Sequence, residues 1–449
     1  MSNSTGIGSI MNDDKESPVK SFDIFSEPEL ESDMISFKNI KIKPTTGGSS
    51  STGPIEFLIT SLGSEYTLMP STRLEGACRV IKNTGEDLAG SEDVSVVNLF
   101  PSSLFKQIEC SVNGTEVVDQ SVGAHPFKAY METLLSYGRE AKNTHLLTEC
   151  FIKDRSGSED ADQKSDSSGK TGYMERNELI KASKVVHFST QLHIDFFNTK
   201  KLLPPSVNLK IRLIRNEDSF SLIAKTGAYK IEIIPDSLCL NIRKIFPSTY
   251  ILRKHEQLFK SGKNAIYPFQ QARLTTHLVT AGTQHVGLQN VCTGPLPSQM
   301  FVVQVDHDAF NGALGKNPFH FKNNGMNSFR FLINGESHPA EIFKPDFAND
   351  DFMREYRNLL DCIGIAFNNT GVDITPKEFK TGSCIMAYDS CPDICAGMRT
   401  HLPKNGTINI EMDYKAPTTK AITILVYQIY DRIVEINGAD KSCTIKYLT

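Results

Sequence analysis

Apolar and polar side chains alternate with a period of two residues along much of this chain. The alternation is clearest in four segments, at residues 186–196, 207–213, 408–414 and 422–427. A strand covered on one face shows this period, whereas a helix repeats about every 3.6 residues. Glycine, proline and asparagine punctuate the segments, so the pattern predicts short strands arranged as β-sandwiches.

Two segments show helical periodicity instead. The first covers residues 126–137, with Pro126 in its first turn, Gly138 as its stop, and an apolar stripe of Phe127, Tyr130, Met131, Leu134 and Leu135. The second covers residues 351–363, with Asp350 as the expected cap, Gly364 as the stop, and a stripe of Phe352, Tyr356, Leu359, Leu360 and Ile363. We therefore expect two short amphipathic helices.

The surroundings of the two helices are similar. Each helix follows an Asn-Gly hairpin signal, at Asn113-Gly114 and at Asn334-Gly335, which lie 221 positions apart. Each is followed by two alternating segments, 186–196 with 207–213 and 407–414 with 421–430, which we expect to close the two halves. Coincidence is the alternative, since such turns and helices are common. The shared order favours two tandem copies of one sandwich.

The domain organisation follows from this repeat. Residues 1–53 are polar and predict a flexible N-terminal arm that carries no excess of basic residues. The first sandwich is expected at 54–226 and the second at 227–449. The segment 154–172 is acidic and poor in apolar residues, and predicts an exposed loop within the first sandwich.

Composition narrows the class of protein further. The chain has 449 residues, 39% of them hydrophobic, which is enough for about two globular domains. Its formal net charge of −4 gives no bulk attraction for nucleic acid. We expect neither a membrane span nor a signal peptide, because the apolar runs are short and the N-terminus has no basic start. The ten cysteines are therefore expected as reduced thiols in a protein that is not secreted.

Several segments occur in an order that resembles the major capsid proteins of Polinton (Maverick) elements and adintoviruses. In the first half they are VVNLFPSSLFKQIECSVNGTEV, AHPFKAYMETLLSYGREAKNTHL and IDFFNTKKLLPPSVNLKIRLIR. In the second half they are NAIYPFQQARLTTHLV, GPLPSQMFVVQVDHDAFNGALGKNPFHFKNNGM and INGESHPAEIFKPDFANDDFMREYRNLL. The resemblance covers about residues 55–449. The segment 382–397 departs from the family pattern at Cys384 and Ser390, which leaves the subgroup open.

The resemblance implies an all-β double jelly-roll of two tandem eight-stranded sandwiches, each with a short helix in a loop. It implies a homotrimer whose six barrels form a pseudo-hexagonal capsomer, because two similar units in each of three chains approximate six-fold symmetry. Such capsomers would form an icosahedral shell around a double-stranded DNA genome, in contact with neighbouring capsomers, penton proteins and minor capsid proteins. The expected location is the virion, and neither catalysis nor a cofactor is implied.

Jelly-roll folds also include metalloenzymes, and the sequence offers three candidate metal sites. His193 and Asp195 form the His-x-Asp pair of non-haem iron oxygenases, but alternation places both on the polar face with His187, which we expect to be solvated or to contact a neighbour. Neither His187/His193 nor His277/His285 has the spacing of a cupin site. Cys384, Cys391, Cys395 and His401 lack the paired spacing of common zinc sites, and buried thiols are the favoured interpretation.

A nucleic-acid role would require aromatic side chains that stack on bases. The candidates are Phe301, Phe310, Phe319, Phe321, Phe329 and Phe331. They lack a basic stripe, so core packing and contacts between barrels are favoured over base stacking.

We therefore expect function to reside in assembly. The residues expected to matter are structural: Asn113, Gly114, Tyr130, Leu134, Leu135, Asn334, Gly335, Tyr356, Leu359 and Leu360. Asn317, Pro318 and Phe319 belong to a segment that resembles the family, without an assigned contact. A non-viral jelly-roll remains the alternative, as a carbohydrate-binding module or a domesticated capsid protein.

Overall fold

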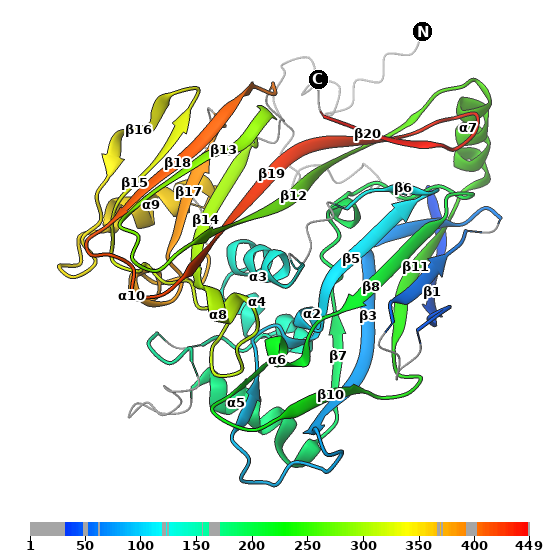
Figure 1. The fold of residues 1–449 in the computed structure, drawn as a ribbon. Helices are drawn as coiled ribbons and strands as arrows, with labels where there is room; N and C mark the ends of the chain where they lie inside the picture. The colour runs from blue at the N-terminus through cyan, green and yellow to red at the C-terminus, as the bar shows by residue number, and fades with distance from the viewer. Residues whose placement is uncertain are drawn as a thin grey trace, which may run out of the picture.

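The alternating segments form antiparallel β-sheets in the computed structural model (Figure 1). The structure describes residues 32–47, 53–61, 63–118, 123, 125–154, 156–160, 171–365, 369, 371–391 and 402–447. Two sandwiches lie side by side, and helix α7 (Thr249–Lys260) lies at one end of the molecule.

The first sandwich consists of two facing sheets. One sheet has the strand order β1-β11-β3-β10, with β7 also paired to β3, and the other has the order β2-β8-β5-β6. The strands are β1 (Met34–Ile42), β2 (Ile55–Ile59), β3 (Tyr66–Lys82), β5 (Phe105–Val112), β6 (Thr115–Glu116), β7 (Val186–Thr190), β8 (Leu209–Arg215), β10 (Tyr229–Ile233) and β11 (Cys239–Pro247). A short pair, β4 (Val94–Val96) and β9 (Leu222–Ala224), lies beside them.

The second sandwich has the same arrangement. Its sheets have the orders β12-β19-β14-β17, with β20 also paired to β19, and β13-β18-β15-β16. The strands are β12 (Ala265–Val279), β13 (His285–Pro295), β14 (Gln299–Asp306), β15 (Met326–Ile333), β16 (Glu336–Phe343), β17 (Ile385–Asp389), β18 (Asn405–Tyr414), β19 (Ile422–Ile436) and β20 (Cys443–Tyr447).

The strand order shows that the fold is duplicated. Within the described residues, β1, β2, β3, β5, β6, β7, β8 and β11 occupy the same sheet positions, in the same chain order, as β12 to β19. The expected all-β double jelly-roll is therefore confirmed, with eight equivalent strands in each sandwich and one additional strand in each, β10 and β20.

The helices connect or cover the sheets. The longer ones are α3 (His125–Ser136), α5 (Gly172–Ile180), α7, α9 (Met353–Cys362) and α10 (Pro376–Thr381). The short turns are α2 (Phe100–Ser103), α4 (Arg139–Lys142), η2 (His145–Glu149), η4 (Lys181–Ser183), η5 (Asp195–Asn198), α6 (Asp218–Ser221) and α8 (His307–Phe310). The two helices expected from periodicity are α3, between β6 and β7, and α9, between β16 and β17, so they are equivalent elements.

The strand pairing differs from the sequence expectation in three respects. The segments 186–196 and 207–213 do not close the first sandwich as a pair, because β7 pairs with β3 whereas β8 pairs with β2 and β5. The segments 407–414 and 421–430 are not a pair either, because β18 pairs with β13 and β15 whereas β19 pairs with β12 and β14. The strand of the second sandwich that is equivalent to β8 is β18. The strand that closes the first sandwich is β11. Because β10 and β11 lie beyond residue 226 and both pair with β3, we propose a boundary after Pro247. Strand β1 pairs with β11, so residues 34–42 belong to the first sandwich and not to the expected arm.

Candidate functional site at the junction of the two barrels

The two Asn-Gly turns form equivalent hairpin corners. Asn113-Gly114 joins β5 to β6 and Asn334-Gly335 joins β15 to β16, with φ angles of 47° and 87° in the first turn and 51° and 87° in the second. Both positions of each turn are left-handed, which asparagine and glycine tolerate best. The twist of this turn matches that of the flanking strands, so the pair fixes the hairpin register.

Each turn asparagine also joins its hairpin to a third strand. The side-chain oxygen of Asn113 accepts from the amide of Asn208 at 2.8 Å, and that of Asn334 accepts from the amide of Thr407 at 2.9 Å. The backbone amide of Asn113 donates to the carbonyl of Asn208, and the backbone amide of Asn334 donates to the carbonyl of Thr407. The duplication therefore extends to individual hydrogen bonds.

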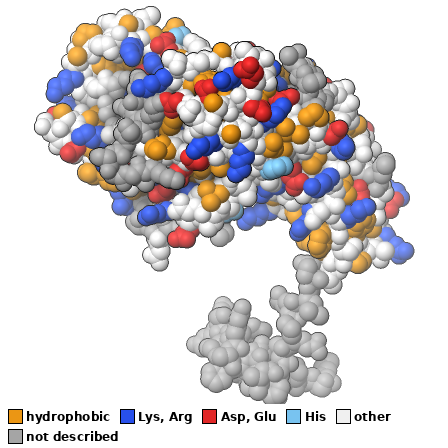
Figure 2. Space-filling view, turned by 90° about the horizontal axis from the view of Figure 1, so that it is seen from below, with side chains coloured by type: hydrophobic (Ala, Val, Ile, Leu, Met, Phe, Trp, Pro, Cys, Tyr) orange, Lys and Arg blue, Asp and Glu red, His pale blue; other side chains and the backbone are white. Residues whose placement is uncertain are grey.

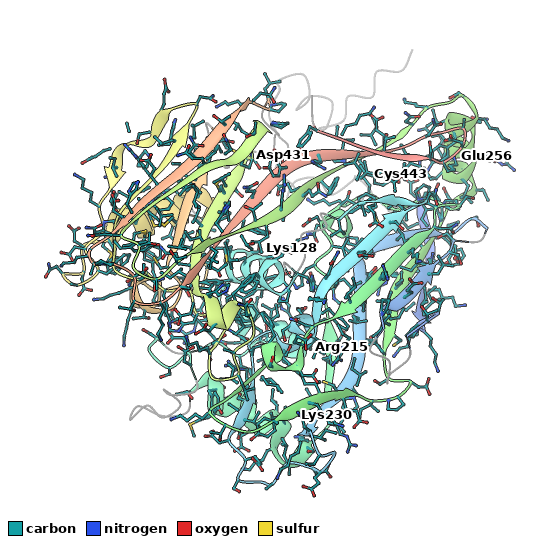
Figure 3. All side chains as sticks on the ribbon, in the orientation of Figure 1. Lys128, Arg215, Lys230, Glu256, Asp431 and Cys443 are labelled. Atoms are coloured by element: carbon teal, nitrogen blue, oxygen red, sulfur yellow. The ribbon has the colours of Figure 1, made fainter. Side chains whose placement is uncertain are left out.

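Helix α3 lies between the two barrels (Figure 1), and Figure 3 shows Lys128 on it near the centre of the molecule. Tyr130, Leu134 and Leu135 are all buried in one apolar cluster with residues of the second sandwich. The ring of Tyr130 stacks on Phe319 with a centroid distance of 4.3 Å and an interplanar angle of 11°. Helix α3 thus joins the two barrels.

Helix α9 packs within the second sandwich instead. Leu359 is fully buried, whereas Tyr356 and Leu360 are partly buried against the same cluster. The hydroxyl of Tyr356 donates to the carbonyl of Ile374 at 2.8 Å. Asp350 does not cap this helix as expected, because Phe352 precedes it and Asp350 pairs with Lys380 at 2.5 Å. Gly364, with φ of 72°, follows the helix as expected.

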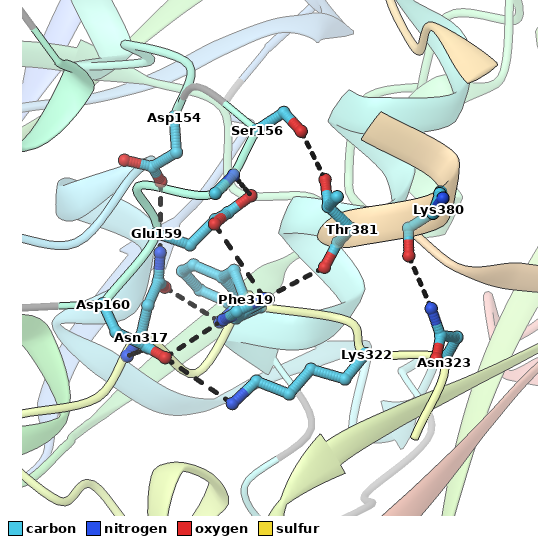
Figure 4. A network of polar contacts seen from close by, with 12 residues as sticks. Asp154, Ser156, Glu159, Asp160, Asn317, Phe319, Lys322, Asn323, Lys380 and Thr381 are labelled. Carbon is cyan, nitrogen blue, oxygen red and sulfur yellow. Dashed lines mark hydrogen bonds and ion pairs between the residues drawn. The ribbon is translucent and has the colours of Figure 1, made fainter. Parts of the chain in front are cut away.

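The first part of the segment 154–172 forms a polar contact between the barrels (Figure 4). Asp154 accepts from Asn317 at 3.1 Å and pairs at 2.6 Å with Arg176, which is fully buried. Asp160 accepts the backbone amide of Asn317 at 2.9 Å. The expectation of an exposed loop is wrong for Asp154, Glu159 and Asp160: Glu159 is buried, and the carboxylates of Asp154 and Asp160 have partners across the junction. Residues 155 and 161–170 lie outside the described part.

His320 pairs with Asp160 in this contact. Its Nε2 atom lies 3.1 Å from the carbonyl oxygen of Thr381, and its Nδ1 atom lies 3.1 Å from Asp160. A carbonyl oxygen and a carboxylate both accept, so both ring nitrogens must carry hydrogen and the imidazole is charged. Burial alone would lower the pKa of His320, but the hydrogen bond and charge of Asp160 raise it. Burial would raise the pKa of Asp160, yet the contacts with His320 lower it to about 2.

A second polar cluster surrounds His193 and Asp195. Asp195 lies 2.7 Å from Lys128 and accepts the amide of Ala272 at 3.0 Å, which joins α3 to β12 of the second sandwich. His193 Nδ1 lies 3.1 Å from Glu132. Burial would raise the pKa of Glu132, but the charge and hydrogen bond of His193 hold it at about 2.

Of the two alternatives expected for His193 and Asp195, solvation or contact with a neighbour, solvation is wrong, because both side chains are buried. Strand β7 ends at Thr190, and His193 has a left-handed φ of 48°, so the alternation does not continue to these residues as one strand. Asp195 is committed to Lys128 and to a backbone amide. Among the described residues, no group of three or more His, Cys, Asp or Glu side chains is arranged to hold a metal ion.

The proposed zinc ligands are only partly described. Cys384 is buried in the apolar cluster of the second sandwich, and burial raises the pKa of its thiol to about 12. Cys395 and His401 lie outside the described residues, so the set of four is not tested.

The other surfaces are mixed in character. On the face that Figure 2 shows, the described acidic and basic side chains are interspersed with apolar ones. Of the phenylalanines considered for base stacking, Phe301, Phe319, Phe321, Phe329 and Phe331 are buried. No described helix is long and apolar enough to cross a membrane.

Sequence comparison with known proteins finds a distant relative. No family model matches the chain. An uncharacterised Caenorhabditis elegans protein, F54H12.2, is 20% identical over 398 residues, which are 86% of this chain and 91% of that protein.

Solved structures match nearly the whole chain. The virophage Sputnik structure matches with a TM-score of 0.60 over 96% of this chain and 92% of that one, at 11% identity. PBCV-1 VP54 matches with a TM-score of 0.57 over 95% and 100%, at 11% identity, and the mavirus major capsid protein with 0.52 over 96% and 93%, also at 11%. The chain therefore has the fold of double jelly-roll viral major capsid proteins.

Proposed function

We propose that the chain is a structural major capsid protein of a DNA virus or virus-like element, without catalytic activity. The observation that carries the proposal is the match of both barrels together, since the matched structures cover at least 95% of this chain in one alignment. A single jelly-roll supports many functions, whereas a chain-long duplication with a shared junction supports few.

The proposed unit is a homotrimer. Its two barrels are built on the same strand order, so three copies present six similar walls around a three-fold axis. Such a pseudo-hexagonal capsomer can contact six neighbours in an icosahedral shell around double-stranded DNA. Penton and minor capsid proteins would fill the remaining positions, and the protein would be located in the virion.

The Polinton and adintovirus assignment rests on the sequence segments that resemble that family. The nematode relative supports an element carried in an animal genome rather than a free virus alone. It also favours the second candidate, a domesticated capsid protein that no longer encloses a genome. A carbohydrate-binding module remains the more distant alternative, and glycan-array binding without particle formation would favour it.

Light scattering of the purified chain tests the trimer directly. We expect a monodisperse species of about 150 kDa at micromolar concentration, because each chain is 49.9 kDa. A monodisperse monomer of about 50 kDa at the same concentration would count against the proposal.

A further inference from the structure

Helix α7 crosses from the first barrel to the second and leaves an apolar pocket uncovered beside it. None of its twelve residues is buried, although its hydrophobic stripe includes Ile251, Leu258 and Phe259. These three side chains line a pocket of about 420 Å³ together with Tyr66, Ile266 and Tyr267. Leu258 is 38% exposed and Ile266 is 48% exposed, so the described residues cover this apolar surface only in part.

We propose that this pocket binds residues 22–30 of the same chain. The proposal goes beyond the capsid role and does not depend on it. The sequence FDIFSEPEL at these positions combines Phe22, Ile24 and Phe25 with acidic side chains. It offers the large apolar groups that a pocket of this kind can bury.

The position of the chain makes the contact possible. The described chain begins beside α7, because the carbonyl of Asp33 accepts the amide of Ser248 at 2.9 Å, and Ser248 is the N-cap of the helix. A helix of twelve residues is about 18 Å long. Nine extended residues span about 30 Å, so the segment reaches every part of the pocket. Attachment in the same chain gives an effective concentration on the order of millimolar, so weak contacts suffice.

The charges are complementary. Residues 22–33 contain five acidic and no basic side chains, namely Asp23, Glu27, Glu29, Glu31 and Asp33. Lys201 and Lys263 line the pocket and are exposed, and neither has an ion pair with a described residue. Arg253 and Lys254 add positive charge on α7 itself, whose one acidic residue, Glu256 (labelled in Figure 3), pairs with Lys260. An acidic segment is therefore attracted to this side of the molecule.

Photo-cross-linking in the full chain tests the proposal. Phe25 is replaced by p-benzoylphenylalanine, and an equal mixture of isotopically heavy and light protein separates cross-links within one copy from those between copies. We expect cross-links within one copy to peptides that contain Ile251–Phe259 or Ala265–Tyr267. The same probe at Ile10, outside the proposed segment, should not favour these peptides.

Substitutions in the pocket provide the matched comparison. Leu258→Asp should lower the cross-link yield at least five-fold without unfolding the protein, since the side chain is already partly exposed. Leu402→Asp replaces a leucine that is 86% exposed and does not line the pocket, and should leave the yield unchanged. Cross-links that join different copies, cross-links to another surface, or a yield that Leu258→Asp does not change would each overturn the proposal.

Discussion

Asn113 and Asn334 stabilise the two barrels through the same pair of contacts. Each occupies a left-handed turn position, and each accepts a hydrogen bond from a third strand through its side chain. The Asn-Gly sequence predicted both turns, because the positive φ angles of such a turn are required of the turn residues themselves. It did not indicate Asn208 and Thr407 as partners, because a cross-strand contact depends on a register that local sequence does not specify.

Replacement of either asparagine should therefore destabilise its barrel. Asn334→Ala removes the acceptor for the Thr407 amide and puts alanine, which tolerates the left-handed conformation less well than asparagine, at a φ of 51°; together these changes cost about 1–3 kcal/mol. Asn334→Asp retains both the oxygen and the tolerance of this conformation, so it should retain most of the stability. Urea unfolding monitored by fluorescence measures the difference. Equal midpoints for the alanine variant and the parent would contradict this role.

His320 should make the stability of the junction depend on pH. Its pKa is raised in the folded protein, so its contribution is complete below its usual pKa of 6.5 and is lost as pH rises through the raised value. The pKa of Asp160 is lowered from 3.8 to about 2, so its contribution is present above 3.8 and is lost as pH falls toward 2. Together the pair stabilises the protein most between pH 4 and pH 6.5.

Thermal melting of the parent and of His320→Gln measures this dependence. The difference in Tm should be largest near pH 5.5 and should shrink as pH rises through the folded pKa of His320, because groups common to both proteins cancel. A difference that stays constant from pH 5 to pH 9 would show that folding leaves the pKa of this imidazole unchanged, and would contradict the charged pair.

At the scale of elements, α3 and α9 look alike in sequence but have different roles. Periodicity predicted both helices and their apolar faces, because it reports burial of one side. It could not show which barrel covers that side. The aromatic partner of Tyr130 is Phe319, almost 190 positions later in the chain. The exposure of the polar segment at 154–160 was predicted wrongly for the same reason, since Asp154 and Asp160 bind Asn317 and His320 of the other barrel.

The two helices should respond differently to loss of an aromatic partner. Phe319→Ala removes the ring on which Tyr130 stacks and should speed hydrogen exchange in α3, although the helix is distant in sequence. Phe352→Ala is the matched control, because Phe352 stacks on Phe347 and Phe379 beside α9. Each change should cost about 3–5 kcal/mol. Faster exchange of α3 in the control alone would contradict its assignment to the junction.

At the scale of the whole molecule, the alternation and the internal sequence repeat are consistent with the double jelly-roll that the family resemblance implied. They did not predict the residues at which the two sandwiches begin and end. Strand β11 lies beyond the expected boundary, and its alternation is interrupted by Lys244, which is fully buried through bonds to Ser61 and Thr67. Strand β1 is mostly exposed at a sheet edge, so it has little burial signature. Both strands were identified by pairing with distant residues.

The duplicated architecture connects the fold to the proposed function. In each barrel the same eight sheet positions are filled in the same order, and the junction joins the barrels through α3, Phe319 and the His320–Asp160 pair. A fixed junction holds the two walls of one chain at a constant relative orientation, which a pseudo-hexagonal tile requires.

Cryo-electron microscopy of the full-length protein expressed alone tests the central claim most directly. We predict three-fold particles with a pseudo-hexagonal outline, in which each chain contributes two upright barrels, or closed shells built from such units. A population of single two-barrel chains with no three-fold particles, at concentrations where the protein is folded and soluble, would contradict the account.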